Sequence, residues 1–150
     1  MSELRELYQQ VILDHNKAPR NYGRLADANR HQEGFNPLCG DHVHVYLHVD
    51  GETIRDVSFE GVGCAISRAS ASLMTAAVKG QTVAAAQELF ARFHAMLMSG
   101  PDAPVDEEAL GKMAVFAGVR EFPMRVKCAT LAWHTVRAAL DGTAEPVSTD

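Results

Sequence analysis

The chain has 150 residues, of which 47% are hydrophobic and 22% charged, and its formal net charge is −5. These values are typical of one globular domain with a core of ordinary size and exclude a largely disordered chain. The acidic balance argues against nucleic-acid binding, which needs a basic face to neutralise phosphates. No apolar run reaches the roughly 18 residues of a membrane-spanning helix, and the N-terminus lacks a signal-peptide core. We therefore expect a cytoplasmic protein that binds neither nucleic acid nor membrane.

The first half of the chain predicts one helix and two strands. Apolar residues at helical spacing predict a helix over residues 3–13, and Pro19 and Gly23 interrupt the chain after it. From His42 to Val49, polar and apolar residues alternate, which predicts a half-buried strand. The Asp-Gly-Glu segment at 50–52 predicts a hairpin turn into a second strand over residues 53–63.

The second half predicts helices over 64–79 and 83–98, and a last helix that ends at Asp141 and Gly142. Between them, residues 99–108 are predicted to form a loop, with a short helix that starts near Asp106. Trp133 and Phe122 are expected to pack the last helix against the sheet. This order of elements predicts an α+β fold, with helices packed on one face of a small antiparallel β-sheet. We expect one domain over residues 1–142 and a disordered tail over 143–150.

Strand alternation separates Asp41 from the histidines that follow it. Asp41 would share a face with Val43 and Val45, whereas His42, His44 and His48 would lie on the opposite face. A metal bound by Asp41 could not also take these histidines without a bulge. We therefore interpret the histidines as a polar face exposed to solvent.

The three cysteines, Cys39, Cys64 and Cys128, are an odd number far apart in the chain, which does not predict a disulfide framework. Cys64 and Cys128 are expected near the starts of helices, where the helix dipole favours a thiolate, and Arg125 and Lys127 would act in the same direction. Three thiolates and the Asp41 carboxylate would suit tetrahedral Zn²⁺, and thiolates also bind iron–sulfur clusters. The alternative is three buried cysteines that pack as small apolar residues.

Three motifs around these cysteines resemble those of the U-type iron–sulfur assembly proteins: NPLCGD, GVGCAISRASASLMT and FPMRVKCATLAW. The resemblance extends over most of the chain and implies the α+β fold of IscU- and SufU-like members. Scaffold-type members usually carry a histidine just before the third cysteine, where this chain has Lys127. Lys127, and a long segment between Cys64 and Cys128 with residues 99–110 as an insertion, resemble the SufU-like branch instead.

This resemblance implies a zinc-bound sulfurtransferase with Cys39, Asp41, Cys64 and Cys128 as the metal ligands. Such a protein accepts persulfide sulfur from a SufS-like cysteine desulfurase and passes it to a SufBCD-like assembly complex. We expect Cys39 to accept the sulfur, because it lies in a Gly-flanked loop that can move. Arg125 is expected to orient the site or its partner, the alternative being a surface arginine. The other functions left open are a scaffold that builds a [2Fe–2S] cluster on the same ligands and a purely structural zinc protein.

Overall fold

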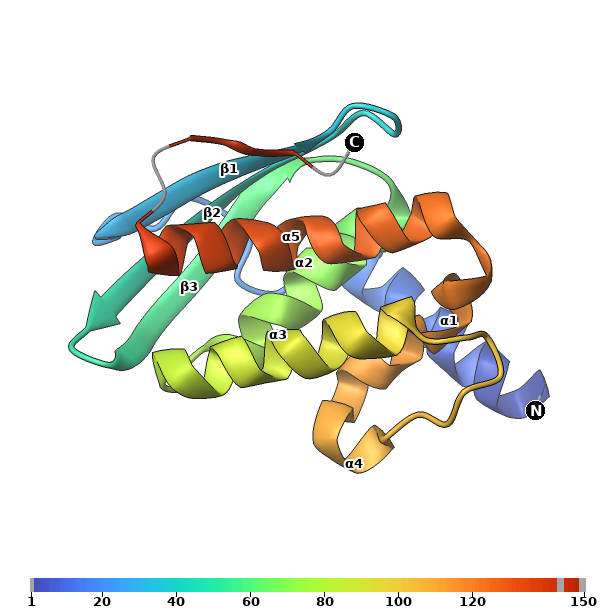
Figure 1. Ribbon diagram of the computed structural model, residues 1–150. Helices are drawn as coiled ribbons and strands as arrows, with labels where there is room; N and C mark the ends of the chain where they lie inside the picture. Colours follow the sequence, from blue (N-terminus) through green and yellow to red (C-terminus); the bar gives the residue numbers. More distant parts are fainter. Residues whose placement is uncertain (1, 143–144, 149–150) are drawn as a thin grey trace.

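The computed structural model describes residues 2–142 and 145–148, and it consists of a four-stranded sheet with helices packed on one face (Figure 1). This confirms the predicted α+β fold. The elements follow in the order α1 (Ser2–Lys17), β1 (Arg30–Asn36), β2 (Asp41–Asp50), β3 (Thr53–Val62), α2 (Ala65–Val78), α3 (Val83–Met98), α4 (Glu107–Leu110), the 3₁₀ helix η1 (Gly111–Glu121), α5 (Pro123–Asp141) and β4 (Val147–Ser148).

The strand order is β3-β2-β1-β4, and the sheet is mixed rather than wholly antiparallel. β2 pairs antiparallel with both β1 and β3, whereas β4 pairs parallel with β1. Val147 and Ser148 of β4 belong to the segment 143–150, for which the sequence predicts disorder. Residues 143–144 and 149–150 of that segment lie outside the described residues, and the single-domain boundary at 142 stays a prediction.

β2 follows the predicted alternation. Asp41 and the valines after it face the core, whereas the histidines lie half-exposed on the other face. Gly51 turns the chain into β3 with a φ of +62°, a backbone conformation that favours glycine. The alternation therefore fixes which side chains of this strand can reach the helices.

β1 has no counterpart among the predicted strands, because its sequence, RHQEGFN, has no apolar alternation. The strand forms through pairing with β2 along its length, from Arg30 opposite Leu47 to Asn36 opposite Asp41. Gly34 lets α5 approach the strand closely, since a Cβ at Gly34 would lie 2.1 Å from the hydroxyl oxygen of Thr135. This close approach holds α5 against β1.

α2 and α5 pack directly against the sheet, and α3 lies beyond them, as Figure 1 shows. Trp133 is fully buried, and its ring lies 5.4 Å from that of Phe93, between centroids. Trp133 thus packs α5 against α3. The expectation for Phe122 is wrong, because this side chain is 57% exposed.

The helix boundaries follow local capping. The Thr82 hydroxyl accepts a hydrogen bond from the Ala85 N–H at the start of α3, and the Asp106 carboxylate does so for Ala109 at the start of α4. The predicted restart near Asp106 is therefore confirmed. Across the residues that the structure describes, no helix is both long enough and apolar enough to cross a bilayer.

Candidate metal centre

The hairpin between β1 and β2 carries two of the four predicted ligands. Its loop, residues 37–40, places Cys39 half-buried at the turn, where the Cys39 N–H donates to the Asn36 carbonyl at 3.2 Å. Gly40 follows with a φ of +71°, and Asp41 is the first residue of β2. Because Asp41 occupies a core-facing position, its side chain is only 2% exposed.

Cys64 caps the N-terminus of α2, as the sequence predicts. Its Sγ accepts a hydrogen bond from the Ser67 N–H at 3.4 Å, and its own N–H donates to Asp41 Oδ1 at 2.9 Å. The preceding Gly63 leaves room for this carboxylate, since a Cβ there would lie 2.7 Å from Asp41 Oδ1. Asp41 and the start of α2 are therefore locked together.

Cys128 is fully buried in the second turn of α5, because the helix begins at Pro123 rather than next to the cysteine. The predicted position at a helix N-terminus is thus wrong for Cys128. A proline fits the first turn of a helix, where no N–H bond is lost. The Cys128 Sγ lies 3.3 Å from Cys39 Sγ and 3.6 Å from the Met124 carbonyl oxygen.

The fold thus brings all four predicted ligands together. One donor atom each from Cys39, Asp41 and Cys128 lies within 4.8 Å of the others, and Cys64 Sγ lies 4.0 Å from Asp41 Oδ2. A tetrahedral zinc with Zn–S bonds of about 2.3 Å separates its sulfur ligands by about 3.8 Å. The spacing of the donor atoms is compatible with that geometry.

Asp41 gives a second reason to expect a cation here. Its carboxylate is buried, yet no lysine, arginine or histidine side chain that the structure describes forms an ion pair with it. A buried carboxylate without a counter-charge is costly. A divalent cation bound by the three thiols would supply that charge, so the residues present fit zinc.

Asn36 belongs to this site, although no pattern in the sequence points to it. It is fully buried, and its Nδ2 donates to Asp41 Oδ2 at 3.4 Å and to Cys128 Sγ at 3.5 Å. Its Oδ1 has no hydrogen-bond partner among the described residues. Asn36 sits just before the Cys39 loop, but only the unpredicted strand β1 turns its side chain toward the core.

The thiols differ in their affinity for a proton. Hydrogen bonds from the Cys128 thiol and from the Ser67 N–H lower the pKa of Cys64 to about 6. Donation to Cys64, together with burial and the nearby Cys39, raises the pKa of Cys128 well above its ordinary value. The Cys128 thiol therefore holds its proton more tightly than the Cys64 thiol does.

Arg125 lies in the first turn of α5, three residues before Cys128, and is exposed. Residues three apart share a helix face. Within the described part of the chain, its guanidinium forms no hydrogen bond or ion pair, so it is free to contact a partner. Its predicted role stays a prediction.

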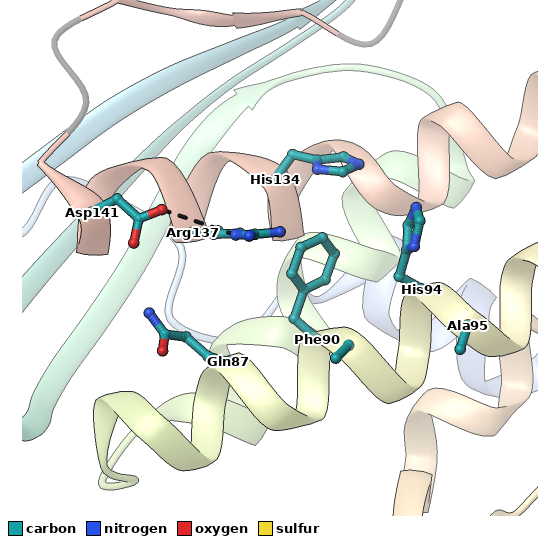
Figure 2. A pocket seen from close by; sticks show the side chains of 8 residues that line it. Gln87, Phe90, His94, Ala95, His134, Arg137 and Asp141 are labelled. Atoms are coloured by element: carbon teal, nitrogen blue, oxygen red, sulfur yellow. Dashed lines mark ion pairs between the residues drawn. The ribbon is translucent and has the colours of Figure 1, made fainter.

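The cavity in Figure 2 lies away from the thiols, between α3 and α5. It has a volume of about 390 Å³, and its walls include Phe90, His94, His134 and Arg137. Burial lowers the pKa of His134. None of the predicted site residues lines this cavity, so it has no direct part in the metal centre.

The chain is similar to known proteins of iron–sulfur cluster assembly. The model of the NifU-like N-terminal domain family matches residues 7–139. The chain is 44% identical to the zinc-dependent sulfurtransferase SufU of Bacillus subtilis (strain 168), over 90% of each protein. It is 40% identical to the iron–sulfur cluster assembly scaffold protein IscU of Streptococcus pyogenes serotype M1, over 93% of this chain and 86% of the relative.

Its fold is also similar to the crystal structure of a putative iron–sulfur cluster assembly scaffold protein for the SUF system from Fervidobacterium islandicum AW-1. The TM-score is 0.81 at 39% sequence identity, and the match covers 87% of this chain and 94% of the other.

Proposed function

Because this chain belongs to the NifU-like N-terminal domain family, on its SufU branch, we propose that it is a zinc-dependent sulfur-transfer protein of iron–sulfur cluster assembly. It accepts sulfur from the persulfide of a cysteine desulfurase and passes it to a SufBCD-like assembly complex. The observation that carries the proposal is the convergence of three free thiols on a buried carboxylate that lacks an ion-pair partner among the described residues. A cytoplasmic, reducing location would keep these thiols free.

Four residues would hold the zinc: Cys39, Asp41, Cys64 and Cys128. Bound Zn²⁺ supplies a Lewis acid without redox chemistry, which keeps the thiols deprotonated and protects them from oxidation. Asn36 positions two of these ligands, because its amide donates to both Asp41 and Cys128.

Cys39 is the proposed sulfur acceptor. It lies half-buried in a loop, whereas Cys128 is fully buried and Cys64 is held at a helix cap. Its thiolate attacks the terminal sulfur of the desulfurase persulfide, and a new S–S bond forms to Cys39. The original S–S bond breaks, and the desulfurase cysteine leaves as a thiolate. The exchange moves one sulfur atom without an external oxidant or reductant.

Exposed apolar side chains near the cysteines in sequence support a protein partner. Leu38 precedes Cys39, Val62 precedes Cys64 by two residues, and Met124 and Phe122 precede Cys128, all more than half exposed. Apolar side chains gathered around a site are typical of a docking surface. Arg125 lies among them, and we propose that it orients the desulfurase on this surface.

Desulfurase turnover with and without this protein tests the proposal. The wild-type chain should stimulate turnover and carry an extra sulfur on Cys39, detected by mass spectrometry. Cys39→Ser should abolish both effects, and Arg125→Gln should weaken stimulation but leave zinc content unchanged. Gln87→Ala, at an exposed position on α3, is the matched control. A folded Cys39→Ser protein that still stimulates fully would leave only a structural role for the metal.

Assembly of a [2Fe–2S] cluster on the same four residues is the second candidate, favoured by the similarity to scaffold proteins. Metal analysis after strictly anaerobic purification separates the two functions. Stoichiometric zinc without iron–sulfur absorption supports sulfur transfer. A stable cluster that is handed to an acceptor protein would establish the scaffold instead.

A further inference from the structure

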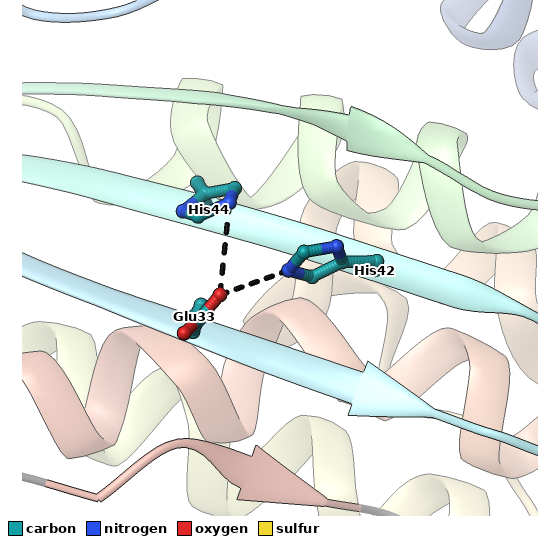
Figure 3. Close-up of side chains that lie close together, drawn as sticks. All are labelled: Glu33, His42 and His44. Carbon is teal, nitrogen blue, oxygen red and sulfur yellow. Dashed lines mark hydrogen bonds and ion pairs between the residues drawn. The ribbon is translucent and has the colours of Figure 1, made fainter.

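A second cluster of potential metal ligands lies on the face of the sheet that the helices do not cover. Glu33 projects from β1, and His42 and His44 project from β2, as Figure 3 shows. The register explains their meeting, because Glu33 is directly opposite His44 and diagonal to His42. Side chains in these positions of an antiparallel pair lie within reach of each other.

The donor atoms of these residues are already spaced for one ion. Glu33 Oε2 lies 2.9 Å from His42 Nε2 and 3.7 Å from His44 Nε2, and all three donor atoms lie within 4.8 Å of one another. Zinc bonds to nitrogen and oxygen of about 2.0–2.2 Å separate ligand atoms by roughly 3.0–3.5 Å. Small side-chain rotations would bring the three atoms to that spacing.

Neighbouring rings hold the two histidines in this orientation. The second nitrogen of His44, Nδ1, lies 2.9 Å from His31 Nε2, so His44 can donate to His31 while its Nε2 stays free to accept a metal. The rings of Phe35 and His42 stack with centroids 4.3 Å apart. Metal-binding histidines usually donate their other ring N–H to an acceptor, which fixes the tautomer, and His31 Nε2 would take that place for His44.

We propose that Glu33, His42 and His44 form a second metal site, for a divalent first-row transition ion such as Zn²⁺. Two histidines and one carboxylate leave coordination positions for water, which the half-exposed side chains allow. This proposal revises the interpretation of His42 and His44 as a purely polar face. It also goes beyond the sulfur-transfer function and does not depend on it.

The two sites are independent, although Asp41 and His42 are consecutive. Asp41 points to the core face of β2 and His42 to the opposite face, so the sheet separates the ions and no ligand is shared. Without a metal, Glu33 would form ion pairs with both histidines, which the same distances allow. That alternative predicts that no second equivalent of metal binds.

Cobalt titration of the full chain tests the proposal. Co²⁺ at the thiol site gives intense sulfur-to-metal charge-transfer absorption, whereas Co²⁺ on nitrogen and oxygen ligands gives only weak visible bands. We expect wild-type protein to bind one equivalent of each kind. The two signals are read separately, so the second site is measured even if the thiol site fails to bind, which keeps this proposal distinguishable from the proposed function.

Single variants locate the second equivalent. Glu33→Gln and His44→Gln should each weaken it by at least about tenfold, and His31→Gln by about tenfold through loss of the orienting contact. His48→Gln is the matched control, because His48 lies on the same face of β2 but pairs with Asp27. The affinity of this variant for the second equivalent of Co²⁺ should stay within about twofold of wild type. Circular dichroism checks that each variant folds. Absence of a second equivalent, or equal affinity in Glu33→Gln, His44→Gln and wild type, would overturn the proposal.

Discussion

At the scale of single residues, Asp41 joins the parts of the metal centre. Its carboxylate accepts hydrogen bonds from the Cys64 N–H and from Asn36, so it connects the β1–β2 hairpin to the start of α2. The contact leaves no room for a side chain at Gly63, which lies beside Asp41 Oδ1. A carboxylate held in this way presents its other oxygen to the thiols.

Gly63→Ala should therefore weaken metal binding. The added Cβ would lie 2.7 Å from Asp41 Oδ1, so the carboxylate must leave the position in which its other oxygen faces the thiols. We expect zinc affinity, measured by competition with a chromophoric chelator, to fall by about tenfold or more. Gly118→Ala is the control, because a Cβ at Gly118 meets nothing within 4 Å. Equal zinc affinity in both variants would contradict this role of Gly63.

At the scale of elements, the distance between β1 and α5 sets the geometry of the centre. Asn36 lies at the end of β1 and Cys128 on α5, and the amide of Asn36 contacts the sulfur of Cys128. Gly34 and Thr135 form a close approach between the two elements. A side chain at Gly34 would push the helix away from the strand and separate these two groups.

Gly34→Ala should destabilise the fold by about 1–3 kcal/mol, as expected for an overpacked core. The new Cβ would lie 2.1 Å from Thr135 Oγ1, so the second change Thr135→Ala should restore part of the lost stability. Urea unfolding of both single variants and the double variant measures this coupling. Strictly additive free energies would contradict the predicted coupling between Gly34 and Thr135.

Prediction from sequence succeeded where local patterns decide the structure. The alternation in β2 and the caps at Thr82 and Asp106 are local signals, and the structure confirms them. β1 was not predicted from the sequence, because its polar residues form a strand only by pairing with β2. Without β1, neither the contacts of Asn36 with the thiols nor those of Glu33 with the histidines could be foreseen.

The candidate metal centre was predictable only in part for the same reason. Residue chemistry and resemblance named Cys39, Asp41, Cys64 and Cys128, but their spacing in the chain contains no short metal-binding motif. Their meeting depends on tertiary packing, which the structure supplies. α5 also begins at Pro123, so Cys128 lies in the second turn of the helix and not at the predicted N-terminus.

At the scale of the whole molecule, histidines make stability depend on pH. Burial, followed by repulsion from Arg20, lowers the pKa of His15 below its ordinary value of 6.5. Burial likewise lowers the pKa of His31 and of His134. The unfolded chain therefore binds protons at these sites before the folded chain does. Their contribution to stability is complete above the unfolded pKa and is lost as the pH falls through the folded values.

The free energy of unfolding of the metal-free protein should thus decrease as the pH is lowered from about 7 to about 5. His15→Gln should make this decrease shallower, because one of the groups that gain a proton on unfolding is gone. Its Nδ1 lies 2.7 Å from the Ser72 hydroxyl, so the variant should also be less stable at neutral pH. Urea unfolding at several pH values measures both effects. An unchanged slope in His15→Gln would contradict the assignment.

The distance along the chain between the thiols has a consequence for biosynthesis. Cys39 and Cys128 are 89 residues apart, yet their sulfur atoms lie 3.3 Å from each other. A ribosome releases the hairpin first and α5 much later, so an emerging chain holds Cys39 and Cys64 without their third sulfur partner. Until α5 packs against the sheet, these two thiols are accessible to oxidants and to other metal ions. We therefore expect the metal ion to bind after α5 has been translated, when the helices already pack against the sheet.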